Sequence, residues 1–262
     1  MTYDKAYIIY FSPTRTSAKV ATAVADAFKA DSVTEIDLTY EAFPAPYILE
    51  NAIAFVAVPV YGGRVAETAV ARFKQIKAQN CLAVPIVLYG NRDYEDALLE
   101  LTELCVAQGF KSVAAGAFIG EHSYSIPSMP IALNRPDAED IKLASEWGVV
   151  IREKLLAFDS VEALPQLTVR GIFPYKEKGV PTPVTPITVE DLCTQCEHCI
   201  EICPTSAIAL NVASEIESDA EKCIKCCACV KECPQMARIF DTPYTAMLFN
   251  KFKAHRMPEL FA

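Results

Sequence analysis

The sequence predicts a parallel α/β domain followed by a small cysteine-rich domain. Residues 1–158 alternate apolar runs with amphipathic stretches at helical spacing, which is the pattern of a parallel sheet covered by helices. Further along, eight of the 11 cysteines form two groups of identical spacing between Cys193 and Cys233. A chain of 262 residues is long enough for one large domain and one small one.

The predicted strands are rich in Val, Ile, Ala and Tyr, and most are apolar throughout, as strands buried on both faces are. In the first helical stretch, Val20, Ala21, Val24 and Phe28 share one face. Five strands with this alternation indicate a doubly wound domain. The strands are predicted at Ala6–Phe11, Ser32–Asp37, Ile53–Val58, Leu82–Tyr89 and Ser112–Ile119, and the helices at Ser17–Lys29, Val65–Gln79, Tyr94–Gln108 and Pro136–Phe158.

The segment 159–186 contains five prolines and little periodicity, so it is predicted to be a linker or an extended arm that wraps the first domain. Residues 187–240 form the predicted cysteine-rich domain. The tail, 241–262, carries Tyr244, Phe249, Phe252 and Phe261 and is expected to pack back on the body of the protein.

Charge and hydropathy exclude several classes of partner. The net charge is −9, and between Thr188 and Phe240 four Lys/Arg stand against nine Asp/Glu. A nucleic-acid partner is therefore not expected, and the cysteine-rich domain should present an acidic surface to basic patches. The longest apolar stretch, Ala52–Tyr61, is too short to span a membrane, and the first residues lack the basic region of a signal peptide. We expect a cytoplasmic protein with no membrane segment.

The two cysteine groups read CTQCEHCIEICP and CIKCCACVKECP and recur with a period of 30 residues. Each is C-x2-C-x2-C-x3-C-P, whereas a zinc site typically takes its four ligands in two pairs. The stretch Ile187–Phe240 resembles a bacterial two-[4Fe–4S] ferredoxin, a small α+β domain. In that family the fourth cysteine of each run ligates the other cluster. The resemblance thus implies one cluster on Cys193, Cys196, Cys199 and Cys233, and a second on Cys203, Cys223, Cys226 and Cys229.

Three cysteines lie outside this pattern. Cys81 opens an apolar run and Cys105 lies on a predicted helix, so both are expected to pack as small apolar side chains. Cys227 is an extra thiol inside the second group. It is interpreted as a packed residue beside the cluster, with a redox-linked exchange of ligands as the alternative.

Three loops at the predicted carboxyl edge of the sheet have the chemistry of a nucleotide site. The first reads FSPTRTS and leads into a helix, so its hydroxyl and N–H groups can hold a phosphate, although such clusters are also ordinary helix caps. The third and fourth strands are followed by PVYGGRV and YGNRDYED, which combine glycine with aromatic rings. A receiver domain is set aside because it needs an aspartate at the end of the first strand, where Phe11 and Ser12 stand.

The first domain resembles flavodoxin, with a five-stranded parallel sheet, and the whole chain resembles the flavodoxin–ferredoxin fusion proteins of anaerobic bacteria and archaea. Flavodoxin loops usually have glycine where Arg15 stands. Arg15 either adds a counter-charge or marks a reshaped loop that holds flavin less well. The resemblance implies FMN bound by Ser12, Thr14, Arg15, Thr16 and Ser17 at the phosphate, and by Pro59, Val60, Tyr61, Gly62, Gly63, Tyr89, Gly90, Asn91, Arg92, Asp93 and Tyr94 at the ring.

A further loop at the same edge, GEHSYS, contains Glu121, His122 and Tyr124. A single histidine is most often structural, but Glu121 and His122 are candidates for catalytic proton donors near a reduced ring.

These features predict an electron-transfer protein in which FMN and two [4Fe–4S] clusters exchange electrons and serve redox partner proteins. The alternative is a flavin-dependent oxidoreductase that acts on a small molecule and uses the clusters as a wire. The arm could bring the clusters to the flavin of the same chain, or hold them apart so that each chain pairs with a neighbour in a homodimer.

Overall fold

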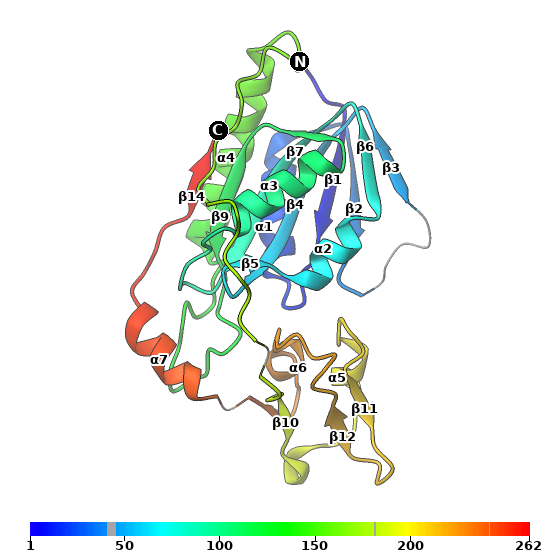
Figure 1. Cartoon of the computed structure of the whole chain (residues 1–262), viewed down its shortest axis with the longest axis vertical. Coiled ribbons are helices and arrows are strands. Elements are labelled where there is room, and N and C mark those ends of the chain that lie inside the picture. Colours follow the sequence, from blue (N-terminus) through cyan, green and yellow to red (C-terminus); the bar gives the residue numbers. More distant parts are fainter. Residues whose placement is uncertain (41–45, 181, 241) are drawn as a thin grey trace.

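The structure is a computed structural model that describes residues 1–40, 46–180, 182–240 and 242–262. The α/β domain forms the upper part of the molecule in Figure 1, and the cysteine-rich domain lies below one edge of its sheet. In the described part of the chain, no helix is both long and apolar enough to cross a membrane.

Five parallel strands form the centre of the α/β domain. They lie in the order β2-β1-β4-β7-β9, which for parallel strands in chain order is 2-1-3-4-5, the flavodoxin-like order. The predicted fold class is therefore confirmed. The direction of winding changes between β1 and β4, and a ligand site is expected outside the carboxyl ends there. The strands are β1 (Lys5–Tyr10), β2 (Ser32–Asp37), β4 (Ile53–Tyr61), β7 (Cys81–Tyr89) and β9 (Ala115–Ile119).

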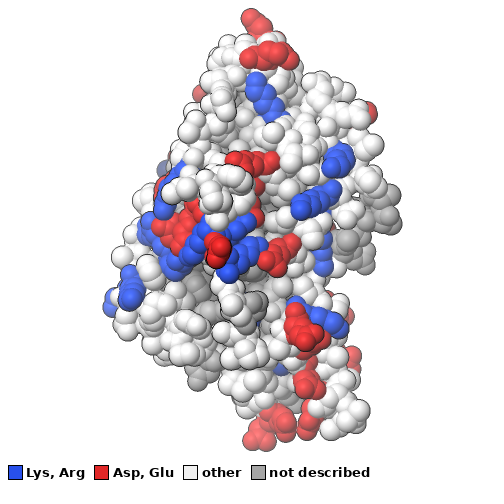
Figure 2. Space-filling view, viewed as in Figure 1, with Lys and Arg blue, Asp and Glu red and all other residues white. Residues whose placement is uncertain are grey.

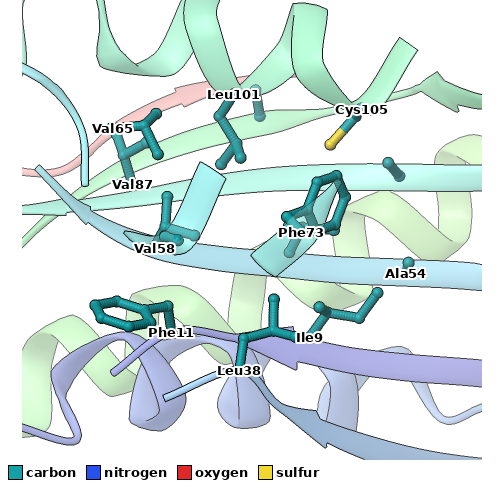
Figure 3. Close-up of a cluster of buried hydrophobic side chains, with 14 of the residues drawn as sticks. Ile9, Phe11, Leu38, Ala54, Val58, Val65, Phe73, Val87, Leu101 and Cys105 are labelled. Carbon is teal, nitrogen blue, oxygen red and sulfur yellow. The ribbon is translucent and has the colours of Figure 1, made fainter. Parts of the chain in front are cut away.

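Helices cover both faces of this sheet, because alternate residues of each strand point to opposite sides. On one face, Ile9 and Phe11 join Phe73 and Leu101 from α2 (Glu67–Phe73) and α3 (Ala97–Ala107), as Figure 3 shows. The other face packs against α1 (Thr16–Phe28) and α4 (Ala138–Leu156). Cys81 and Cys105 are both buried in the first of these cores.

Two predicted elements differ from the structure. The stretch Val65–Gln79 is not one helix: β5 (Arg64–Val65) precedes α2, and β6 (Ile76–Gln79) follows it. The helical pattern gives way because β6 pairs with β3 (Tyr47–Glu50), a contact that local periodicity does not encode. The predicted strand Ser112–Ile119 is divided into β8 (Phe110–Ser112) and β9, because the two segments pair with successive parts of β7.

The segment 159–186 lies along the α/β domain as an extended arm, and its described residues contain no helix or strand. Arg170 forms an ion pair with Asp93, and the backbone N–H groups of Ile172 and Lys176 donate to the Asp96 carboxylate at 2.9 and 2.7 Å. These contacts fix the arm across the loop that follows β7.

The tail returns to the α/β domain after the cysteine-rich domain. It forms α7 (Pro243–Phe252) and then β14 (Glu259–Phe261), which pairs antiparallel with β9 at the edge of the sheet. The five-stranded parallel sheet predicted from the sequence thus gains an antiparallel edge strand, which is too short for a sequence pattern to reveal.

The cysteine-rich domain consists of two short antiparallel strand pairs and two short helices. The paired strands are β10 (Ile187–Thr188) with β13 (Arg238–Ile239), and β11 (Ile208–Leu210) with β12 (Ile216–Ser218). A 3₁₀ turn at Glu190–Leu192 precedes the first cysteine group, and α5 (His198–Glu201) and α6 (Ala228–Lys231) lie within the two groups.

Candidate cluster and cofactor sites

The two cysteine groups adopt the same backbone conformation. Gln195 and Glu197 in the first have positive φ values of 54° and 59°, and Lys225 and Cys227 in the second have 57° and 59°. Residues other than glycine rarely adopt this region, which costs roughly 1–2 kcal/mol each. Where right- and left-handed backbone conformations alternate, successive N–H groups line a concavity that binds anions, including iron–sulfur centres. Both loops are therefore shaped for a negatively charged cluster.

Each set of four cysteines lines its own cavity of about 330 Å³, including space open to solvent. We call them the inner cavity, lined by Cys203, Cys223, Cys226 and Cys229, and the outer cavity, lined by Cys193, Cys196, Cys199 and Cys233. Cys203 and Cys233 thus cross to the other group, as in the grouping that the ferredoxin resemblance implies. Among the described residues, no group of three or more His, Cys, Asp or Glu side chains is placed to hold a single metal ion. Thiols spread around a cavity suit a multinuclear cluster.

Hydrogen bonds to sulfur repeat between the two groups. The N–H groups of Ala207 and Ala237 donate to the sulfurs of Cys203 and Cys233 at 3.2 and 3.3 Å. Such bonds stabilise thiolates and help to set the potential of a cluster. Burial works in the opposite direction and raises the pKa of Cys226 to about 12. A free thiolate is thus disfavoured in the inner cavity.

The inner cavity faces the carboxyl edge of the sheet. Ile224, next to Cys223, packs against the hydrophobic core of the α/β domain. The pKa of Tyr61, at the end of β4, is raised well above its ordinary value by burial and by the nearby Cys226 and Cys227 thiols. In the outer cavity, by contrast, Cys196 is exposed.

Polar and aromatic contacts hold the two domains together. The Lys231 ammonium, on α6, forms an ion pair with Glu121 and donates to the carbonyl of Ser125 at 2.8 Å. Arg72, on α2, donates to the carbonyl of Pro204 at 2.6 Å. The rings of Tyr124 and Phe240 meet edge to face with centroids 5.1 Å apart. The docking surface therefore includes residues next to two cysteines of the inner set, Cys203 and Cys223.

The loop after β1 has free donors for an anion. Within the described chain, the N–H groups of Thr14, Thr16 and Ser17 donate to no protein acceptor, and the hydroxyl of Ser17 is fully buried without a partner. The Ser12 hydroxyl accepts from the N–H of Ala18 at 3.1 Å. An unpaired buried hydroxyl is costly, so this start of α1 fits a phosphate that would accept from these groups.

The backbone of Arg15 bears on one of the alternatives left open by the sequence. Its φ of 63° lies in the left-handed region that glycine adopts freely, so the loop keeps a glycine-like backbone although the residue is arginine. The guanidinium lies 6.0 Å from the centroid of the Tyr10 ring. The backbone at this position is thus one that glycine also adopts, and the arginine side chain adds a positive charge beside the loop.

The loops after β4 and β7 are packed against each other and against later parts of the chain. The Gly63 Cα faces the Glu95 side chain and the Gly90 Cα faces the His122 ring, with no space for a Cβ at either glycine. Pro59, Val60 and Tyr61 are half-buried and Gly62 is exposed. Several ring-side candidates are instead engaged within the protein: Asn91 with the carbonyls of Phe252 and Ala254, Arg92 with Glu95, Asp93 with Arg170, and Tyr94 with Glu259, while the Tyr89 ring packs against Arg256.

His122 lies between the two domains and is half-buried. Burial, together with the charges of Lys231 and Arg92, lowers its pKa to about 4. Its Nδ1 accepts the N–H of Tyr124 at 3.0 Å, which places the hydrogen of the neutral ring on Nε2. Glu121 accepts from the N–H of Asn134 as well as from Lys231. The structure thus brings both proton-donor candidates to the sheet edge. Glu121 is already paired there with Lys231 of the cysteine-rich domain.

Comparison with known proteins decides the nature of the C-terminal part. The family model for the 4Fe–4S dicluster domain matches residues 185–234. The chain joins a flavodoxin-like domain to a 4Fe–4S dicluster domain. The dicluster domain accounts for both cysteine groups and both cavities.

Three curated relatives match parts of the chain. A selenate reductase subunit of Mesobacillus selenatarsenatis is 41% identical over 51 residues, covering 19% of this chain and 18% of that protein. A polysulfide reductase component of Wolinella succinogenes is 35% identical over 51 residues, covering 19% and 27%. An Hdr-like menaquinol oxidoreductase iron-sulfur subunit 1 of Archaeoglobus fulgidus is 29% identical over 110 residues, covering 41% and 33%. The chain thus spans a third or less of these relatives.

Solved structures resemble the flavodoxin-like domain distantly. Rubredoxin oxygen:oxidoreductase from Desulfovibrio gigas has a TM-score of 0.42 at 17% identity, covering 59% of this chain and 36% of that one. A flavodoxin from the domain Archaea has a TM-score of 0.39 at 15% identity, covering 58% and 99%. The fold assignment itself rests on the strand order.

Sequence reasoning missed the residues that join the domains and surround the clusters. Arg72 and Lys231 make contacts with residues more than 100 positions away, for which no local signal exists. Arg238 lines the outer cavity and is 3% exposed. A signal for Arg238 was present, because the 30-residue repeat places Ile208 at the equivalent position of the other half.

Proposed function

We propose that this protein transfers electrons between an FMN on the flavodoxin-like domain and the two clusters, and from there to redox partner proteins. Electron transfer as such follows from the dicluster domain. The observation that carries the proposal is the docking of the inner cavity on the carboxyl edge of the sheet, beside Tyr61. FMN exchanges electrons singly or in pairs, whereas each cluster carries one.

The residues of the chain would hold and shield these centres. The free N–H groups of Thr14, Thr16 and Ser17 and the buried Ser17 hydroxyl would bind the phosphate. Ile224 and Tyr124 pack between the domains, and the ion pair of Lys231 with Glu121 would help to fix the orientation of the domains. A fixed contact favours transfer within one molecule, since tethering keeps the effective concentration high.

Coverage of the sheet edge favours a carrier over an enzyme that acts on a small molecule. The arm, α7 and the dicluster domain all contact the loops after β7 and β9. We propose redox proteins, rather than a small substrate, as the donors and acceptors. Steady-state turnover with a small molecule in the absence of any protein partner would favour the flavin-dependent oxidoreductase instead.

The flavin is tested by its identity and its affinity. Mass spectrometry of the released cofactor should find FMN, because the loop after β1 offers donors for a terminal phosphate; FAD would refute the assignment of this loop. Ser17→Ala should weaken FMN binding about tenfold, the cost of a hydrogen bond to a charged group. Ser112→Ala is the matched control. Its hydroxyl is also buried and has no hydrogen-bond partner among the described residues, but it lies on β8, beside the first residues of β7. Equal losses in both variants would contradict the phosphate site.

Electron exchange is tested by rapid mixing under argon, with flavin and cluster absorbance followed together. We expect a rate that does not depend on protein concentration. A rate that rises with concentration down to dilute protein would exclude exchange within one molecule and point to exchange across a homodimer or through other proteins.

A further inference from the structure

Arg238 is a buried positive charge with no negative partner of its own in the described protein. Its side chain belongs to β13 and is 3% exposed. Its guanidinium donates to the Thr188 hydroxyl at 2.7 Å, to the carbonyl of Pro186 at 3.0 Å and to the Ser218 hydroxyl. All three acceptors are uncharged. Among the residues that the structure describes, no carboxylate forms an ion pair with it.

A buried cation is stable only beside a compensating charge, because removal from water costs more than neutral hydrogen bonds return. The compensating charge must therefore come from something other than the described carboxylates. Four thiolates give each iron–sulfur cluster a net negative charge, and that charge grows when the cluster is reduced.

Arg238 is in contact with both cluster sites. Its side chain lines the outer cavity, together with Cys193, Cys196, Cys199 and Cys233. It also donates from Nη2 to the sulfur of Cys229, in the inner set, at 3.9 Å. Its Nε is buried and has no acceptor within the protein. One guanidinium thus reaches a ligand of one cluster while it forms the wall of the other site.

The internal repeat shows that this charge is not a requirement of the cysteine motif. Position 208 in the first half is equivalent to position 238 in the second, and Ile208 is buried there in an apolar cluster with Ile216. The fold therefore accepts an apolar residue at this position, and the arginine has another role.

We propose that Arg238 is a charge shared by both clusters, which raises the reduction potential of each. An electron added to either cluster is stabilised by the same fixed positive charge. The proposal depends on the dicluster domain and not on the flavin. Net charge and hydrogen bonds to sulfur are the established means by which proteins set cluster potentials.

The test is a redox titration of Arg238→Gln, prepared without oxygen and followed by electron paramagnetic resonance. We expect both clusters to become harder to reduce, with the ratio of reduced to oxidised form falling about tenfold at a fixed potential, which is 59 mV for a one-electron couple. Arg238→Lys should restore most of this loss, because it keeps the charge. Lys225→Gln is the control: it removes a charge bonded to Thr182 beside the inner set, and should shift the inner cluster alone.

A shift of one cluster only, or of neither, in Arg238→Gln with full iron content would overturn the proposal. If that variant does not assemble its clusters, Ser218→Ala decides instead. This change removes one acceptor of the guanidinium and keeps its charge in the domain. The potentials of the two clusters should then move in the same direction as each other, by less than in Arg238→Gln. Unchanged potentials for both clusters in Ser218→Ala would then overturn it.

Discussion

The two cysteine loops have the same backbone and different surroundings. Both carry left-handed residues at equivalent places, Gln195 with Lys225 and Glu197 with Cys227. The outer loop leaves Cys196 exposed, whereas in the inner loop Cys226 is buried against the flavodoxin-like domain. The repeated motif therefore determines the shape of a cluster site, and the residues packed around it determine what that site can reach.

Acidic and basic side chains also differ between the outer and inner sides of the dicluster domain. Figure 2 shows acidic side chains at the lower end of the molecule, where the dicluster domain lies. The exposed acidic residues of this domain include Glu190, Asp191, Glu197, Glu201, Glu215 and Glu217. On the inner side, Lys231 of the dicluster domain contacts the flavodoxin-like domain, and Arg72 of the flavodoxin-like domain contacts Pro204 of the dicluster domain. We expect basic partner proteins to approach the outer loop.

The largest test of this comparison exchanges the crossing ligands. Cys203→Ala should remove the cluster of the inner set, and Cys233→Ala that of the outer set, each lowering iron from about eight to about four atoms per chain. Exchange between flavin and cluster should stop in the first variant and survive in the second. Iron analysis and rapid mixing measure the two effects. Loss of exchange in both variants would show that the inner and outer sites are not distinct.

His122 reports on the contact with the inner loop. Its folded pKa of about 4 lies below the ordinary 6.5, so the unfolded state binds more protons between these values and acid favours unfolding. Between pH 7 and pH 5 the free energy of unfolding should fall by about 2 kcal/mol more in the native protein than in His122→Asn. Chemical denaturation at several pH values measures this. Parallel pH profiles would mean that His122 is not held neutral by the docked domain.

The ion pair of Lys231 with Glu121 should stabilise the docked arrangement by about 1 kcal/mol, because both side chains are mostly buried. A double-mutant cycle of Lys231→Gln and Glu121→Gln measures the coupling. The matched control is the exposed pair of Lys222 with Asp219 in the same domain, for which the coupling should be close to zero. Equal couplings would contradict a specific contact at the inner loop.

Cys227 should give the smallest effect. It lines the inner cavity and occupies the left-handed position that Glu197 has in the outer loop. As a packed residue, Cys227→Ala should keep about eight iron atoms per chain and cost about 1 kcal/mol of stability. Glu197→Ala, at the exposed equivalent, is the control and should cost less. Loss of iron in Cys227→Ala alone would support the exchange of ligands instead.

The central strands could be predicted from sequence because burial on both faces leaves a continuous apolar run. The prediction for Ser32–Asp37 coincides with β2, and the buried runs at β4 and β7 were also found. The pairs β3–β6 and β9–β14 could not be found in this way. Their existence depends on contacts between distant segments, and β14 spans only Glu259–Phe261.

The candidate sites divide in the same manner. Cysteine spacing is a local signal that identified the two groups, and the resemblance to a two-cluster ferredoxin implied the two crossed sets that line the cavities. Loop composition after β7 was less informative, because Tyr94 is fully buried and its hydroxyl donates to Glu259, which lies 165 positions later. Glycine with an aromatic ring indicates a turn at the sheet edge, but it does not say which later segment will cover that turn.

The strand β14 makes the dicluster domain an insertion into a sheet rather than an appendage to it. The chain leaves the flavodoxin-like domain along the arm and returns to it through α7 and β14 (Figure 1). Two attachments restrict rotation in a way that a single tether does not. One proteolytic cut in 159–186 would leave the domains joined by the returning strand, and a cut before β14 would uncover the β9 edge for pairing with another molecule. Assembly of the clusters and completion of the sheet are thereby linked through chain order.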